Sequence, residues 1–264
     1  MELIGLHNVS VDYDHIRALE GVNLSIGESD FLGIIGPNGG GKTTLVKAIL
    51  GALPYSGRID YAPELSARTP HPLIGYLPQQ TLFDRSFPIS VEEVVLSGLQ
   101  ALRGFTRRYS AADRQKVGEL LELSGIAHLA RRPVGEISGG QMQRALLCRA
   151  IIAEPRLLIL DEPANFVDNR FENELYRLLQ RLNERMAVVM VSHDLGTITS
   201  VVKEIVCVNR TVHRHHSNRI TEEQLLNYGC PIQIISHGHI PHTVLGHHGD
   251  GDCRCSCSHE HSEQ

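Results

Sequence analysis

The chain has 264 residues, of which 42% are apolar and 21% are charged, and its formal net charge is −5. This length and balance are typical of a globular protein with one large domain, or with a core and a smaller subdomain. The absence of a basic block indicates no nucleic-acid partner. No apolar run approaches the ~20 residues of a membrane-spanning helix, and residues 1–5 lack a signal-peptide pattern, so we expect a cytoplasmic protein.

The first 30 residues alternate between apolar and polar side chains, with glycines at Gly21 and Gly27. A period of two predicts short antiparallel strands, with turns at the glycines. Tyr13 lies among polar residues of this segment. Its ring can either stack on a nucleotide base or lie half-buried in a strand, and the residues alone leave both alternatives open.

The next stretch, GPNGGGKT, fits the phosphate-binding P-loop pattern G-x-x-x-x-G-K-[ST]. An apolar run at 31–35 predicts a buried strand before it, and residues 45–50 predict a helix after it. Glycines let backbone N–H groups converge on phosphate oxygens, while Lys42 is expected at the β- and γ-phosphates and the Thr43 hydroxyl at Mg²⁺. The expected nucleotide-binding residues here are Gly36, Pro37, Asn38, Gly39, Gly40, Gly41, Lys42, Thr43 and Thr44.

Two further strands are predicted near residues 57–61 and 74–77, and Gln79 follows the second of them. A glutamine in that place is ordinarily a solvated loop residue. From residue 88 onward the pattern becomes helical, and Ser90 and Ser110 each begin a helix-capping sequence. The sequence therefore predicts a helical subdomain at about 88–145, inserted between two segments of sheet.

A second glycine-rich helix start follows at Ser138-Gly139-Gly140-Gln141. Ser138 and Gln141 have the spacing of a capping box. Two adjacent glycines are unfavourable inside a helix, so they favour a helix N-terminus that binds phosphate.

Two buried strands are then predicted to deliver polar side chains to one edge of a sheet. Residues 157–160 are apolar and lead into Asp161 and Glu162, and the apolar residues 186–191 lead toward His193. Asp161 is a candidate Mg²⁺ ligand, and Glu162 can orient and deprotonate an attacking water. Because ligands of open α/β sheets lie beyond the carboxyl ends of the strands, we expect His193 near the γ-phosphate.

Taken together, these motifs resemble the ATP-binding subunit of ABC transporters over residues 1 to about 215. The resemblance implies an α/β fold, a P-loop NTPase (RecA-like) core with an N-terminal antiparallel β subdomain and an inserted α-helical subdomain, in a domain of residues 1–216. It implies that Glu162, His193 and Gln79 are catalytic, and that Tyr13 stacks on adenine. It further implies that Thr43, Gln79 and Asp161 hold Mg²⁺.

The resemblance also implies partners. Two copies would pack head to tail, with each ATP between the P-loop of one copy and the signature Ser138-Gly139-Gly140-Gln141 of the other. Hydrolysis would drive a polytopic membrane permease from the cytoplasmic face of the membrane, and an extracytoplasmic metal-binding protein would act indirectly. The sequence departs from the family at Ile137, where many members have leucine, and within residues 164–168, the D-loop. There Ala164, Asn165 and Phe166 differ from the usual residues, while Asp168 keeps the usual aspartate.

Residues 217–264 are predicted to form an extension with a flexible tail rich in histidine and cysteine. Its segment 231–242 is similar to the tails of zinc-importer ATPase subunits, with manganese and iron importers as close relatives. Thiolate and imidazole suit Zn²⁺. The candidate zinc ligands are Cys253, Cys255, Cys257, His259 and His261. The C-x-C-x-C spacing is not the usual one of structural zinc sites, and a polar tail of no set function is the alternative.

Two other functions are alternatives to a transporter motor. A soluble ABC ATPase acting on DNA, ribosomes or protein assembly usually has two modules or long coiled coils, whereas this chain has one module and no sustained heptads. A metal-storage or metallochaperone protein would not need the complete set of ATP motifs.

Overall fold

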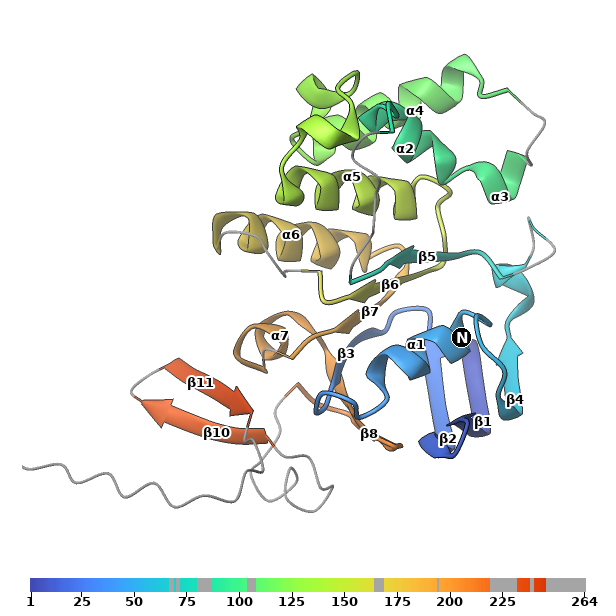
Figure 1. Cartoon of the computed structure of the whole chain (residues 1–264), viewed down its shortest axis with the longest axis vertical. Helices are drawn as coiled ribbons and strands as arrows, with labels where there is room; N and C mark the ends of the chain where they lie inside the picture. Colours follow the sequence, from blue (N-terminus) through green and yellow to red (C-terminus); the bar gives the residue numbers. More distant parts are fainter. Residues whose placement is uncertain are drawn as a thin grey trace, which may run out of the picture.

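The described residues of the computed structural model form a six-stranded and a three-stranded β-sheet with helices packed around them, and a separate two-stranded hairpin (Figure 1). The structure describes residues 1–66, 69, 72–79, 87–103, 108–163, 169–193, 195–218, 232–237 and 240–245. The larger sheet contains, in spatial order, β5 (Ile74–Leu77), β6 (Leu157–Asp161), β7 (Ala187–Val191), β3 (Phe31–Ile35), β8 (Glu204–Asn209) and β9 (Thr211–His215). Neighbouring strands are parallel except for the antiparallel pair β8 and β9.

The central strands of this sheet are buried along their whole length. Strands β3, β6 and β7 have no exposed residue, which explains their unbroken apolar sequences. Since successive side chains point to opposite faces, each strand contributes to two hydrophobic cores. Phe31 joins the core under the helices, while its neighbour Leu32 joins the core shared with the second sheet.

The second sheet is antiparallel and has the order β2 (Ile16–Gly27), β1 (Glu2–Tyr13) and β4 (Ser56–Tyr61). The predicted turn at Gly21 is wrong, because β1 and β2 are long strands and Gly21 lies inside β2. Gly21 has φ +56, and its N–H donates to the Ser10 hydroxyl at 2.8 Å, next to a shift in the β1–β2 register. Gly21 therefore lies in a β-bulge, where glycine can adopt the positive φ that the bulge requires.

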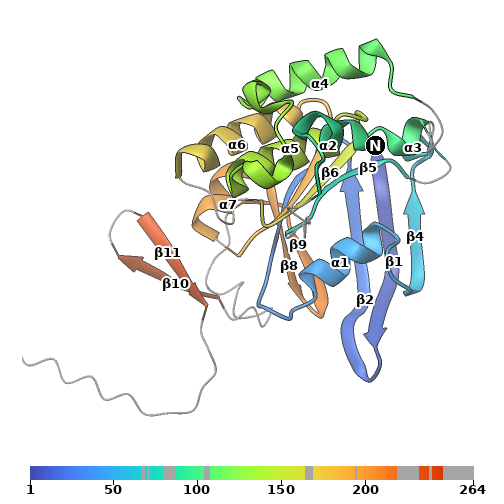
Figure 2. The ribbon, with the colours of Figure 1, turned by 45° about the horizontal axis from the view of Figure 1, so that its top comes forward.

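Helix α1 (Lys42–Ile49) shares one core with both sheets, and Figure 2 shows it lying across β1 and β2. The other helices cover the opposite face of the large sheet. They are α2 (Val91–Ser97), α3 (Gln100–Arg103), α4 (Ala111–Leu123), α5 (Gly139–Ile151), α6 (Asn169–Leu182) and α7 (Leu195–Val201). The capping boxes predicted at Ser90, Ser110 and Ser138 are confirmed. Among the described helices, none combines the length and the apolar character needed to span a membrane.

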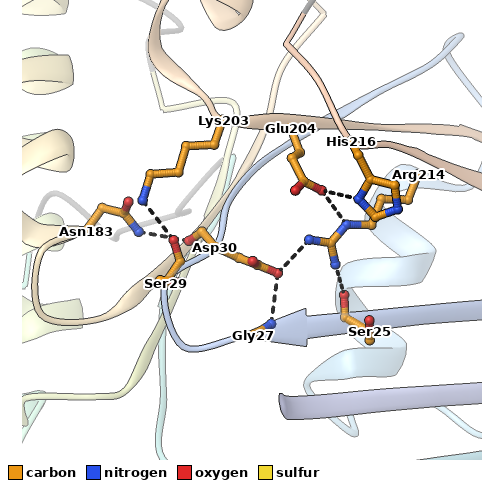
Figure 3. Close-up of polar contacts among 9 residues, drawn as sticks. All are labelled: Ser25, Gly27, Ser29, Asp30, Asn183, Lys203, Glu204, Arg214 and His216. Carbon is orange, nitrogen blue, oxygen red and sulfur yellow. Dashed lines mark hydrogen bonds and ion pairs between the residues drawn. The ribbon is translucent and has the colours of Figure 1, made fainter. Parts of the chain in front are cut away.

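A cluster of charged residues fastens β9 to the rest of the core (Figure 3). The Arg214 guanidinium donates to Glu204 at 2.6 Å, to Asp30 at 3.0 Å and to the Ser25 carbonyl at 2.6 Å. These contacts join β8 and β9 to β2 and to the turn between β2 and β3. His216 lies 3.2 Å from Glu204 at the end of this cluster.

Beyond the core, β10 (Ile232–His237) and β11 (Ile240–Leu245) pair as an antiparallel hairpin, and β11 lies against α7. The predicted α/β fold class is confirmed by the mixed sheet, the antiparallel β1–β2–β4 sheet and the covering helices. The domain boundary at residue 216 stays a prediction.

Candidate active site

The P-loop leaves the end of β3 and enters α1 through a turn that requires glycine. Gly36 has φ +151 and Gly41 has φ +101. A Cβ at Gly36 would collide with the Val208 carbonyl oxygen, and one at Gly41 would lie 2.7 Å from the Ala18 carbonyl oxygen. The loop is therefore held between the end of β8 and strand β2.

Lys42, the first residue of α1, is buried despite its charge, with 7% of its surface exposed. Its ammonium donates to the carbonyl oxygens of Gly36 at 2.9 Å and Pro37 at 3.0 Å. The helix start has no side-chain cap and no acidic residue in its first turn. Backbone N–H groups at a helix N-terminus attract anions, so this end of α1 fits a phosphate chain.

Sheet topology explains how the other predicted site residues reach the P-loop. Strands β5, β6, β7 and β3 are consecutive and parallel, so their carboxyl ends share one edge of the sheet. Gln79 follows β5, Glu162 follows β6, His193 follows β7 and the P-loop follows β3. The residues that follow these parallel strands therefore all lie at the same edge of the sheet, where ligands of open α/β sheets bind.

Thr43 and Asp161 bring two oxygen donors together at this edge. The Thr43 hydroxyl lies 3.4 Å from Asp161 Oδ2, and Asp161 is 2% exposed. Burial raises the pKa of Asp161, and the neighbouring Glu162 raises that pKa further, against the opposing effects of Thr43 and Lys42. A divalent cation would offset this desolvation, and hydroxyl and carboxylate oxygens are ligands that Mg²⁺ accepts.

Glu162 is flanked by the other two residues predicted to be catalytic. The Gln79 amide donates to Glu162 Oε2 at 2.5 Å, and His193 Nδ1 lies 3.5 Å from Oε1. The Glu162 backbone has φ +50, and its N–H donates to the Val191 carbonyl at 3.0 Å. Since a non-glycine residue seldom adopts positive φ, the surroundings fix this carboxylate in place.

Two parts of the predicted site lie apart from this group. Tyr13 is the last residue of β1, and 46% of its surface is exposed, so its ring lies half-buried at the end of the strand. Its stacking on adenine stays a prediction. The Ser138 hydroxyl accepts the Gln141 N–H at 3.3 Å, and the Ser138 N–H donates to Gln141 Oε1 at 2.9 Å. These hydrogen bonds of Ser138 stay within the start of its own helix. Its contact with an ATP held by a second copy of the chain stays a prediction.

The structure also shows supporting contacts that the sequence did not indicate. The Arg210 N–H donates to the Gly40 carbonyl at 2.9 Å, so the turn after β8 braces the P-loop. The Gln143 side-chain amide donates to the carbonyl of Pro163, directly after Glu162. Main-chain contacts such as that of Arg210 leave no signal in side-chain identity.

The D-loop at 164–168 lies outside the described residues, as do Cys253, Cys255, Cys257, His259 and His261 of the tail. Within the described part of the chain, no group of three or more His, Cys, Asp or Glu side chains is arranged to hold a metal ion.

Sequence relatives share most of the chain. A sequence model of the family described as ABC transporter matches residues 19–165. The "Probable metal transport system ATP-binding protein" of Thermotoga maritima is 37% identical over 218 residues, covering 81% of this chain and 85% of that protein. The "Zinc import ATP-binding protein ZnuC" of Pseudomonas putida is 36% identical over 269 residues, covering 99% of this chain and 96% of that protein.

Solved structures give the same family. A chain of an ABC transporter in an inward-facing conformation, described as of the metal-chelate type, is 25% identical with a TM-score of 0.75, covering 92% of this chain and 96% of its own. An ATP-binding cassette, dimeric and bound to ADP and Pi after hydrolysis, is 26% identical with a TM-score of 0.68, covering 83% of this chain and 100% of its own. The chain thus belongs to the ABC transporter family, as an ATP-binding subunit that is an ATPase.

Proposed function

We propose that this chain is the ATP-hydrolysing subunit of an ABC transporter that imports a divalent metal ion, with zinc favoured over manganese and iron. The observation that carries the ATPase part is the convergence of Lys42, the Thr43–Asp161 pair and Glu162 at one edge of the sheet. The names of the relatives in metal transport and zinc import support the cargo.

Nucleotide binding follows from the P-loop geometry. The N–H groups at the start of α1 bind the phosphates, and Lys42 exchanges the carbonyls of Gly36 and Pro37 for β- and γ-phosphate oxygens. Tyr13 stacks on adenine. Thr43, Asp161 and Gln79 would hold Mg²⁺, which would supply positive charge to neutralise the phosphates.

Hydrolysis then depends on Glu162. This carboxylate takes a proton from a water whose oxygen forms a bond to the γ-phosphorus, while the bond from that phosphorus to the bridging oxygen of ADP breaks. Gln79 and His193 hold the two carboxylate oxygens before ATP arrives, and His193 then contacts the γ-phosphate. Most of the rate enhancement comes from position and electrostatics.

The proposed assembly is a head-to-tail dimer on the cytoplasmic face of the membrane, joined to a polytopic permease. Ser138, Gly139, Gly140 and Gln141 reach the ATP on the other copy's P-loop, and an extracytoplasmic metal-binding protein supplies the permease. The dimeric cassette among the similar structures supports the pairing. Residues 1–216, including the helical subdomain at about 88–145, form the motor, and residues 217–264 form an extension.

Transport by the reconstituted complex tests this function. The chain and its membrane partner are co-purified, placed in liposomes with ATP, and supplied with isotopic zinc or manganese. We expect ATP-dependent zinc uptake that exceeds manganese uptake and is lost in Lys42→Ala. Vigorous ATP hydrolysis by a chain that captures no membrane protein would instead indicate a soluble ABC ATPase.

We propose, in addition, that the tail binds zinc through Cys253, Cys255 and Cys257 with His259 or His261, and slows import when zinc is plentiful. The density of thiolate and imidazole ligands supports this site. Thiolates must lose protons to bind, so zinc affinity should fall as the pH drops.

Deleting residues 247–264 tests the tail. We expect the deletion to lower bound zinc and to relieve zinc inhibition of transport, with basal ATP hydrolysis unchanged. Equal zinc stoichiometry with and without the tail would contradict binding. Unchanged zinc inhibition after the deletion would contradict regulation.

A further inference from the structure

The first two turns of α5 connect the signature residues to the segment that follows the catalytic carboxylate. Ser138 caps this helix, and Gln143 lies five residues further along. The Gln143 side-chain amide donates a hydrogen bond to the Pro163 carbonyl oxygen. Pro163 is buried and directly follows Glu162, so its carbonyl needs a partner within the protein.

The neighbouring Arg144 fastens the same part of α5 on its other side. Its side chain is only 24% exposed, and its guanidinium donates to the Ser124 carbonyl at 2.8 Å and to Glu174 on α6 at 3.1 Å. Gln143 thus holds the residue before the D-loop, and Arg144 holds the helix after it. Side chains of α5 therefore contact both flanks of the D-loop.

Glu162 is held firmly by its neighbours and is linked directly to Pro163 through the backbone. Its backbone N–H is bonded to Val191 on the neighbouring strand, and its carboxylate is held by Gln79 and His193. A shift of Glu162 therefore moves Pro163 with it, and the Gln143 hydrogen bond passes that shift to α5.

We propose that Gln143 is a positioning residue that couples the two ATP sites of the dimer. This inference rests on the proposed head-to-tail assembly, in which Glu162 serves the ATP on its own P-loop and Ser138 serves the ATP on the partner's. The Gln143–Pro163 bond is then a path within one chain from one site to the other. Coupling of this kind is measured as cooperativity between the sites.

The test is the ATP dependence of hydrolysis by the full-length dimer. Gln143→Ala removes the side chain, and Gln143→Glu keeps its size but replaces the N–H donor by a carboxylate oxygen. Gln143→Lys keeps an N–H donor of sufficient length. The matched control is Gln115→Glu, since Gln115 on α4 is exposed and donates to exposed Glu119 at 3.0 Å.

For the wild type, Gln115→Glu and Gln143→Lys, we expect a Hill coefficient above about 1.5, where two sites set an upper limit of about 2. For Gln143→Ala and Gln143→Glu, we expect a coefficient near 1, with ATP affinity changed less than about twofold. Because Gln143→Glu preserves the side-chain volume, it tests the role of the hydrogen bond even where Gln143→Ala folds poorly.

Cooperativity retained in Gln143→Glu would overturn the coupling role, and so would a wild-type dimer that hydrolyses ATP without cooperativity. A wild-type chain that forms no ATP-dependent dimer would overturn the proposed assembly, and the coupling with it. These failures are distinguishable, because dimer formation by light scattering and the Hill coefficient are measured separately.

Discussion

Lys42 illustrates how a single residue prepares the site. Its ammonium is almost fully buried, yet two P-loop carbonyls accept its hydrogen bonds, so the charge is compensated before any nucleotide binds. The same carbonyls can be exchanged for phosphate oxygens, which carry full negative charge. The residue is thus ready for its ligand at little cost in rearrangement.

We expect Lys42→Ala to weaken ATP binding by about 30-fold or more, because removing a buried charge partner typically costs about 2–5 kcal/mol. Titration with a fluorescent ATP analogue measures the dissociation constant. Lys47→Ala is the matched control, since Lys47 lies exposed on the same helix. The control should bind within about twofold of the wild type, and wild-type affinity in Lys42→Ala would exclude this role for Lys42.

At the scale of elements, the Arg214 cluster shows how the last core strand is held. Arg214, Asp30 and Glu204 each expose a quarter or less of their side chains, and their hydrogen bonds connect β9 to both sheets. Burial tends to raise the pKa of Glu204, but the Arg214 hydrogen bond and charge outweigh it, so the pKa lies below its ordinary value of 4.5.

Arg214→Leu should lower the free energy of unfolding at pH 7 by about 3 kcal/mol, because it removes the guanidinium from two partly buried carboxylates, Asp30 and Glu204. A carboxylate with a lowered pKa in the folded state stabilises the fold above its unfolded pKa. That contribution disappears as the pH falls through the folded pKa.

The difference between wild type and Arg214→Leu in urea unfolding should therefore be full above pH 5 and should shrink below about pH 4.5. Arg58→Leu removes an exposed pair with Asp60 and serves as the control, with an expected loss below about 1 kcal/mol. A difference that is constant from pH 7 to pH 3 would argue against the role of Glu204 ionisation.

Much of the site's framework could be predicted because it depends on local patterns. Buried parallel strands have unbroken apolar sequences, and the cap at Ser138 has a fixed spacing. The contacts of Glu162 with Gln79 and His193 join residues far apart in the chain, so only the folded sheet reveals them. Gly21 was misplaced because a glycine signals a bulge as readily as a turn.

At the scale of the whole molecule, the proposed head-to-tail assembly gives each chain half of the residues that bind each ATP. The P-loop and Glu162 lie at the carboxyl edge of the sheet, while Ser138 makes its hydrogen bonds within its own helix start. Two copies packed head to tail would complete two sites. In such a two-fold symmetric pair, each copy presents the same surface to the other.

Mixing two inactive variants tests this assembly. Lys42→Ala damages the P-loop and Ser138→Arg damages the signature, so a mixed dimer contains one intact site and one doubly damaged site. We expect ATP hydrolysis to return in the mixture to at most about a quarter of the wild-type rate, because random pairing makes half of the dimers mixed and each has one working site. Mixed dimers detected by mass spectrometry without recovered activity would contradict a head-to-tail dimer in which one intact composite site hydrolyses ATP.

The most direct test of the central claim is hydrolysis of Mg-ATP by Glu162→Gln, measured together with ATP binding and dimer mass. This change keeps the shape of the side chain and removes the base, so we expect the turnover to fall at least about 100-fold. ATP should still bind, and light scattering should show a dimer. Glu184→Gln, an exposed glutamate in the turn between α6 and β7, should behave as the wild type. Turnover at the wild-type rate in Glu162→Gln would contradict this account of the site.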